Sequence, residues 1–255
     1  IMPLLNSKTK KDNDRKNKLL IDRKRIINKA KNKEVLLKKI IQDIQSNKKL
    51  PEFKYAFIYA PEGYEDTDFE QDISSTKIAT EHTKIIDKYC EILGEDLELN
   101  VQTFLGNTKH RKSILKDYKN GKLDCLIAIK CLDEGVDVPR TQYGIFCSST
   151  GNPRQYVQRR GRVIRAHNEK KISYIYDMIV KPNLKRSSIV DEKYIQYERA
   201  IFKKEIIRSI NFIALARNRS MLISSEFNDL CEEYDINLAK EINNERKKYD
   251  NCQDN

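Results

Sequence analysis

Arginine is concentrated in one short segment of the chain, PRQYVQRRGRVIR, residues 153–165. Within it, Gln158, Arg162 and Arg165 step by four and three residues, so they share one face if the segment is helical throughout. A guanidinium stays charged, forks onto phosphate oxygens and stabilises the charge that spreads over a transferred phosphoryl group. The spacing therefore predicts a face that recognises a triphosphate.

The alternative interpretation of this segment is an ordinary basic helix on the protein surface. Such a surface tolerates lysine as readily as arginine, but residues 153–165 contain five arginines and no lysine. This composition favours guanidinium-specific recognition. Arg159 and Arg160 would point away from the face that carries Gln158.

A second segment, CLDEGVDVP at residues 131–139, directly follows the apolar run LIAI. Gly135 permits a close backbone approach or a positive φ, Asp137 presents a carboxylate beside it, and Pro139 ends the element. Ligands of open α/β sheets bind outside the carboxyl ends of the strands. The alternative is a tight turn with a solvated aspartate, and this segment alone does not decide between the two.

Both segments lie in a regular alternation of short apolar runs and helical patterns. The runs are YAFIYA, LELNVQTF, LDCLIAI, YGIFCSS and ISYIYDMIV. Between them the pattern predicts helices at about 74–93 and 109–119, and Asn152 with Pro153 marks the start of another. This alternation predicts an α/β fold, a parallel sheet flanked by helices.

Helical patterns also flank this predicted domain. Residues 13–48 lack proline and glycine, and apolar residues recur there at helical spacing at Leu36, Ile40, Ile41 and Ile44. A second apolar stripe, expected to be a packing face, follows at Phe202, Ile206, Ile210 and Ile213. We therefore expect a basic helical connector at 1–49, the α/β domain at 50–182, and a helical extension at 183–255 whose polar tail frays after about Lys240.

The 255-residue chain carries a formal net charge of +11, and its first fifty residues are rich in lysine and arginine. This charge predicts a polyanionic partner, although an AT-rich coding sequence would explain part of the lysine surplus. The six cysteines form no CxxC pair and the three histidines lie far from them in sequence, which argues against a metal site. Cys125 and Cys147 lie in apolar runs, so we expect both in the core. With no apolar run of about 18 residues and no apolar segment after the basic start, we expect no membrane span, no signal peptide and a cytoplasmic location.

In their order and separation, the two segments resemble motifs V and VI in the C-terminal domain of superfamily 2 helicases. The resemblance is strongest to the DExH enzymes related to XPB and UvsW and to restriction-type translocases. CLDEGVDVP is similar to motif V, and QRRGRVIR, residues 158–165, to the QxxGRxxR form of motif VI. YAFIYA resembles motif IV, and TFLGNTKHR, the helix after it and DCLIAI resemble the stretch in between. The resemblance covers about residues 50–180 and implies a RecA-like domain.

This resemblance implies a nucleotide site made by both motifs. Gly135 and Asp137 would lie against the nucleotide, with the aspartate towards the ribose. Gln158 would face the γ-phosphate or the attacking water. Arg162 and Arg165 would be the arginine fingers.

The same resemblance implies contacts with a nucleic-acid backbone. Gly106, Asn107 and Arg111 would lie near that backbone. Ile129 stands where many relatives have a threonine, so the contact that this threonine makes is missing, and Lys130 would replace it through its charge.

The sequence lacks the phosphate-binding half of an ATP site. Its eight glycines include no GxxxxGK[ST] loop, and no DExH or DExD box is present. We therefore expect ATP with Mg2+ to be bound together with a first RecA-like domain, in cis or in trans, which supplies the Mg2+ ligands. The chain alone is expected not to hydrolyse ATP. Its opening, Ile1 before Met2, is expected of a fragment or of a vector remnant.

Two functions remain open at this point. The first is the second half of an ATP-dependent helicase or translocase, with DNA favoured over RNA because the motif forms resemble those of DNA enzymes. The other is a non-enzymatic nucleic-acid-binding subunit that keeps the fold and uses its basic surface alone. The intact set of Gln158, Arg162 and Arg165 argues for the first.

Overall fold

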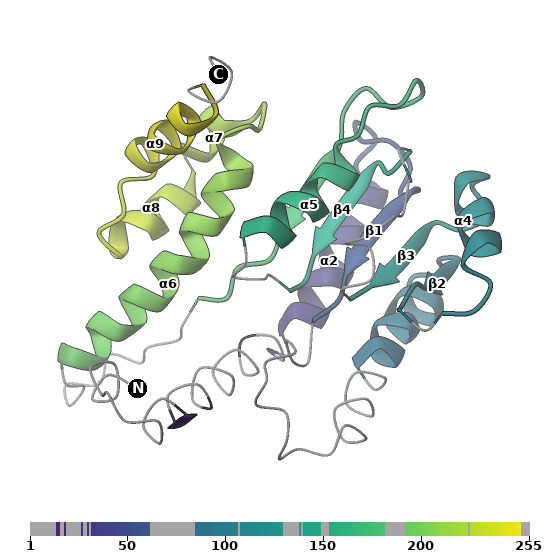
Figure 1. The fold of residues 1–255 in the computed structure, drawn as a ribbon, viewed down its shortest axis with the longest axis horizontal. Helices are drawn as coiled ribbons and strands as arrows, with labels where there is room; N and C mark the ends of the chain where they lie inside the picture. The colour runs from purple at the N-terminus through teal and green to yellow at the C-terminus, as the bar shows by residue number, and fades with distance from the viewer. Residues whose placement is uncertain are drawn as a thin grey trace. The chain divides into compact units, whose positions relative to one another are not determined.

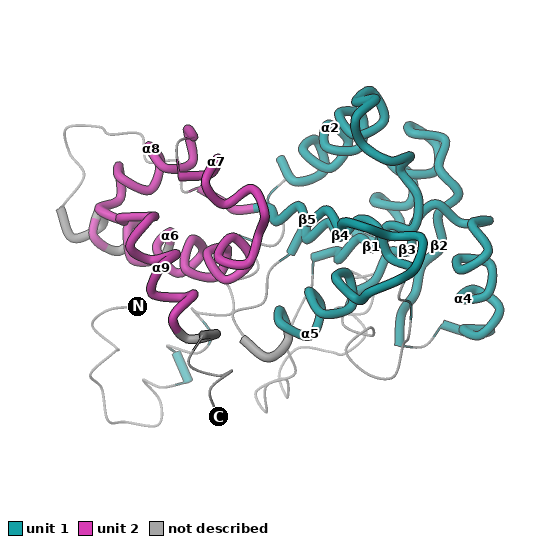
Figure 2. The backbone as a smooth tube through the Cα atoms, turned by 90° about the horizontal axis from the view of Figure 1, so that it is seen from above, with its two compact units in different colours: residues 1–178 teal, residues 179–255 magenta. Residues whose placement is uncertain are grey.

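A computed structural model describes residues 32–61, 85–106, 108–129, 140–148, 153–181, 192–223 and 225–250, together with a few isolated positions such as Val138. The chain divides into two compact units, residues 1–178 and 179–255 (Figure 2). None of the helices in these ranges is both long and apolar enough to cross a membrane.

The first unit is built on a five-stranded sheet with the order β2-β3-β1-β4-β5 (Figure 1). Its strands are β1 (Ala56–Tyr59), β2 (Val101–Thr103), β3 (Cys125–Ala128), β4 (Tyr143–Phe146) and β5 (Tyr174–Asp177). All four pairings are parallel, and central β1 pairs through Ala56 with Cys125 on one side and Tyr143 on the other. Each predicted apolar run therefore forms a strand, and the expected parallel α/β fold is confirmed.

Helices cover both faces of this sheet. On one face lie α2 (Asn32–Ser46), the helix at residues 85–91 and η3 (Ile92–Asp96), a π-helical turn. Their side chains pack against alternate strand residues such as Ile58 and Ile145. On the opposite face lie α4 (Arg111–Lys119) and α5 (Pro153–Val163), which contact Phe57 and Gly144. Helix α4 agrees with the helix predicted at 109–119.

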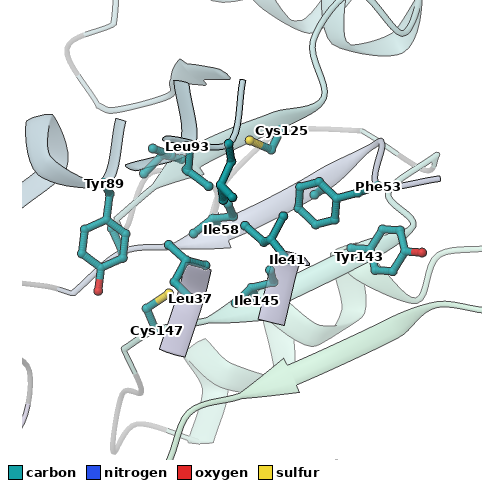
Figure 3. Packing of buried hydrophobic residues seen from close by; sticks show 14 of the residues in the cluster. Leu37, Ile41, Phe53, Ile58, Tyr89, Leu93, Cys125, Tyr143, Ile145 and Cys147 are labelled. Carbon is teal, nitrogen blue, oxygen red and sulfur yellow. The ribbon is translucent and has the colours of Figure 1, made fainter. Parts of the chain in front are cut away.

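The core between α2 and the sheet is shown in Figure 3, where Leu37 and Ile41 lie among the strand residues. Helix α2 falls within the range predicted as a basic connector, yet its buried face belongs to this core. Leu37, rather than the predicted Leu36, occupies the buried position, and Leu36 is 40% exposed. Cys125 is fully buried, as predicted, and burial raises the pKa of its thiol.

The second unit consists of α6 (Glu192–Ile213), α7 (Arg219–Ile223), α8 (Glu226–Glu233) and α9 (Leu238–Asp250). The predicted stripe of α6 forms its core, since Phe202, Ile206, Ile210 and Ile213 are all at most 9% exposed. The expectation that the chain frays after Lys240 is wrong, because α9 continues to Asp250. Its Ile242 is 2% exposed in that core, and Asn211 donates a hydrogen bond to Glu245.

Candidate functional site

Helix α5 carries the predicted triphosphate-binding residues and lies close against β4. It begins at Pro153, as predicted, and ends at Val163. Val163 is fully buried, and a Cβ atom on Gly144 of β4 would lie 2.7 Å from Val163 Cγ2. A glycine in β4 therefore allows the last turn of α5 to approach the sheet this closely.

The arginines of this segment differ sharply in exposure. Arg159 is 1% exposed, Arg160 7% and Arg162 8%, whereas Arg165 is exposed. The Arg159 guanidinium lies over the ring of Tyr59 at 5.4 Å from its centroid, and Tyr59 Oη donates to the Arg159 carbonyl oxygen at 3.4 Å. Arg159 therefore points at the sheet and anchors α5 to β1.

The predicted stripe of Gln158, Arg162 and Arg165 is only partly helical. Because α5 ends at Val163, Arg165 lies two residues beyond the helix, and helical geometry relates Gln158 to Arg162 alone. Gln158 and Arg165 are exposed, while Arg162 is largely covered. The three residues still belong to one short stretch at the end of α5.

The residues assigned to the 131–139 segment, Gly135 and Asp137, lie outside the described residues. Val138, the next residue after Asp137, is 2% exposed. Its carbonyl oxygen accepts hydrogen bonds from the Thr141 amide at 3.3 Å and from Thr141 Oγ1 at 3.0 Å. Thr141 therefore holds the chain where it leaves this segment and enters β4.

Lys170 connects that position to α5. Its Nζ atom donates to the carbonyl oxygens of Thr141 at 2.8 Å and Val163 at 2.7 Å, and Ser173 Oγ also donates to Val163 at 2.9 Å. A cation at this position is favoured by the carbonyl groups at the end of a helix. The side chain is 9% exposed, and burial lowers its pKa from 10.5 to about 8.

Sequence reasoning missed Lys170. It stands beside Lys171 in the stretch NEKKIS, and no spacing in the sequence distinguishes the two. Lys171 is exposed, whereas Lys170 joins Thr141, which follows the 131–139 segment, to Val163, the last residue of α5.

The predicted nucleic-acid contacts lie partly in the connection between β2 and α4. Gly106 is exposed in this connection, and Arg111 begins α4 with its guanidinium 4.6 Å from the centroid of the Phe104 ring. The Phe104 amide donates to the Ile127 carbonyl oxygen at 2.7 Å, so the chain leaves β2 beside the end of β3. Gly106 and Ile129 therefore follow neighbouring strand ends.

The other two residues of the predicted nucleic-acid contact, Asn107 and Lys130, fall outside the described part of the chain. Among the residues that the structure does describe, no group of three or more histidine, cysteine or acidic side chains is arranged to hold a metal ion.

Comparison with known proteins agrees with the motifs. Residues 67–167 match the helicase conserved C-terminal domain. One relative is the DNA 3'-5' translocase XPB2 of Sulfurisphaera tokodaii. The two sequences are 35% identical over an alignment that spans 26% of this chain and 15% of XPB2. A stretch covering 49% of the chain is 24% identical to the ATP-dependent DNA helicase MPH1 of Vanderwaltozyma polyspora and covers 12% of it.

Similar solved structures include the Hef helicase domain of Pyrococcus furiosus, with a TM-score of 0.36 and 22% identity over 66% of this chain and 28% of that one. Domain 2 of the DEAD-box helicase Mss116p bound to an RNA duplex gives a TM-score of 0.41 and 18% identity over 83% of this chain and 79% of that one. The sequence match and the motifs agree: residues 67–167 are similar to the helicase conserved C-terminal domain, and the chain spans only a small part of the relatives that it matches.

Proposed function

We propose that this chain is the second RecA-like half of an ATP-dependent superfamily 2 helicase or nucleic-acid translocase. The observation that carries the proposal is the match to the helicase conserved C-terminal domain over residues 67–167, a range that includes Gln158, Arg162 and Arg165. Two of the curated relatives are named as a DNA translocase and a DNA helicase, which supports DNA over RNA.

The residues in the last turns of α5 and directly after it suit a triphosphate chemically. Two guanidinium groups within four residues can fork onto phosphate oxygens, and an exposed amide beside them can orient a water molecule. Gly135 and Asp137 would lie against the nucleotide and its ribose. ATP, when bound with Mg2+, supplies the transferred phosphoryl group, and its Mg2+ ligands would come from a first RecA-like domain.

Lys170 has a positioning role in this proposal. Its Nζ atom donates a hydrogen bond to the carbonyl oxygen of Val163, the residue directly after Arg162. It also donates to the carbonyl oxygen of Thr141, which follows the segment resembling motif V. Small displacements of a catalytic group are costly, so a rigid end of α5 helps to present Arg162 and Arg165 in one geometry. The phosphoryl group is held mainly by the missing half, so both arginines act only when the two halves close.

Single-turnover hydrolysis at saturating ATP tests this proposal in the full-length protein or with the missing half supplied in trans. Arg162→Ala and Arg165→Ala should each slow hydrolysis by roughly 10³ to 10⁵, with nucleotide affinity changed far less. Arg162→Lys should fail nearly as badly, because an ammonium lacks the planar fork.

Arg217→Ala, at an exposed position in the second unit, is the matched control. Since Arg162 is largely buried, thermal melts must show that its variants are folded, and exposed Arg165 provides a test that does not depend on this. Hydrolysis within a few-fold of wild type in both alanine variants would exclude the assignment and favour a non-enzymatic nucleic-acid-binding subunit.

A further inference from the structure

A row of lysines follows the outer face of α4. Lys112, Lys116 and Lys119 are exposed and step by four and three residues. At about 100° and 1.5 Å per residue, their Cα atoms lie in a sector of about 60° over a length of about 10 Å. Lys109 is exposed in the turn before the helix and extends the row.

The orientation of this row is set by the opposite face of α4. Tyr118 is fully buried, and its ring stacks on Phe57 of β1 at a centroid distance of 5.3 Å. At the other end of the helix, Arg111 lies over the Phe104 ring. Both anchors hold α4 against the sheet, so the lysine row faces away from it.

In the part of the chain that the structure describes, no acidic side chain pairs with this row. Asp117, the only acidic residue of α4, pairs with Lys122 at 3.2 Å. Within the described ranges of the chain, no ion pair involves Lys112, Lys116 or Lys119. Like charges at this spacing repel one another, so an anion that faces all three side chains would stabilise the row.

We propose that Lys112, Lys116 and Lys119 bind the phosphate backbone of a nucleic-acid duplex independently of its sequence. Duplex DNA carries one charge per about 3.4 Å along each strand, so a row of about 10 Å can reach two or three phosphates. Ammonium groups on flexible stems contact phosphates as point charges and do not select a base. An anionic membrane fits less well, because the apolar face of α4 is buried against the sheet and cannot enter lipid.

This surface is separate from the contact predicted at Gly106 and Arg111, since Arg111 is turned onto Phe104. This proposal rests on the proposed function only for the identity of the polyanion, which is nucleic acid. Binding can be measured without ATP and without the missing half. Failure of the lysine row and failure of the arginine fingers are therefore distinguishable.

The test is fluorescence anisotropy of a labelled DNA duplex with the 255-residue chain over a series of salt concentrations. The triple variant Lys112→Gln, Lys116→Gln, Lys119→Gln should bind more weakly. Its slope of log K against log salt should be shallower by up to about 2.7, at about 0.9 for each lost phosphate contact. AT-rich and GC-rich duplexes should show the same change, and the triple lysine-to-arginine variant should keep the wild-type slope.

The matched control removes three exposed lysines of the second unit, Lys203, Lys204 and Lys240, by the same substitution. It lowers the net charge equally and should leave the slope nearly unchanged. A change below about 0.5 in the α4 variant, or an equal change in the control, would overturn the proposal. A loss of binding to anionic vesicles with unchanged DNA binding would overturn it as well.

Discussion

Lys170 Nζ donates a 2.7 Å hydrogen bond to the carbonyl oxygen of Val163, the last residue of α5. The same ammonium group donates to Thr141 at 2.8 Å, and Thr141 in turn binds the Val138 carbonyl oxygen. One buried side chain therefore joins the end of the 131–139 segment to the last turn of α5. The stability of the domain should depend on this contact in a pH-dependent way.

Lys170→Met is expected to destabilise the domain at neutral pH by about 1 to 3 kcal/mol, because two carbonyl oxygens lose a buried donor. Burial lowers the pKa of Lys170 from 10.5 to about 8, so the unfolded chain binds more protons between these values. The free energy of unfolding of the wild type should therefore rise relative to the variant as the pH increases from about 8 towards 10.5.

Urea denaturation at a series of pH values measures this difference, with exposed Lys171→Met as the matched control. The charged groups beside Lys170 are the ion pair of Arg140 and Glu169, whose nitrogen and oxygen lie 2.8 Å apart, and the ring of His167. If the difference in free energy of unfolding between the wild type and Lys170→Met stays constant or falls above pH 8, Lys170 is not the buried group with the lowered pKa.

Gly144→Ala should lower the free energy of unfolding by about 1 to 3 kcal/mol through overpacking. The new Cβ would lie 2.7 Å from Val163 Cγ2, so the end of α5 must move away from β4. Gly161→Ala in α5 is the control, because its Cβ would meet nothing within 4 Å. It should stabilise the helix by up to about 1 kcal/mol, and equal effects of the two substitutions would exclude close packing as the cause.

Arg159→Ala should lower the free energy of unfolding by about 2 to 4 kcal/mol, as expected for a large buried side chain. Its guanidinium lies over Tyr59 and Arg159 as a whole is 1% exposed, so loss of the side chain leaves a cavity between α5 and β1. Arg165→Ala, at an exposed position outside the helix, should change stability by less than about 0.5 kcal/mol. Thermal or urea unfolding compares the two, and a stable Arg159→Ala variant would show that this anchor is dispensable.

The 255-residue chain alone should release no phosphate from ATP above background, with or without DNA. The reason is that its sequence contains neither a GxxxxGK[ST] loop nor a DExH or DExD box. Steady-state phosphate release is the measurement. Turnover of about 1 per second that persists after repurification and disappears in Arg162→Ala would refute the proposal that this chain is half of the ATP site.

The sequence was sufficient to predict the strands and most helices of the first unit. Strands buried on both faces are continuous apolar runs, and such runs, alternating with helical patterns, have few other folded arrangements. The helical stripe of α6 was predicted for the same reason, since Phe202 and Ile206 repeat at the period of a helix. The types and order of residues at 158–165 were likewise enough to indicate the similarity to helicase C-terminal domains, with which the match over residues 67–167 agrees.

Some errors arose where a local pattern had two solutions. Leu36 and Leu37 are adjacent and equally apolar, and only packing against the sheet decides that Leu37 is buried. The sequence after Lys240 is polar, yet Ile242 and the bond between Asn211 and Glu245 hold α9 on α6. Leu238 and Ile242 are the only described apolar side chains of α9 that are buried, and two such residues on an otherwise polar helix are a weak signal until the surface that they pack against is known.

Tertiary structure alone decided how motif VI is held. The contact of Arg159 with Tyr59 joins residues 100 positions apart, and that of Lys170 with Thr141 joins residues 29 apart. Side-chain types and spacing within one segment determine which groups can bind phosphate, because that chemistry is intrinsic to the groups. The packing of α5 on β1 and β4 decides which arginine is buried and which lysine donates hydrogen bonds to two segments. Such packing depends on segments that are distant in the sequence.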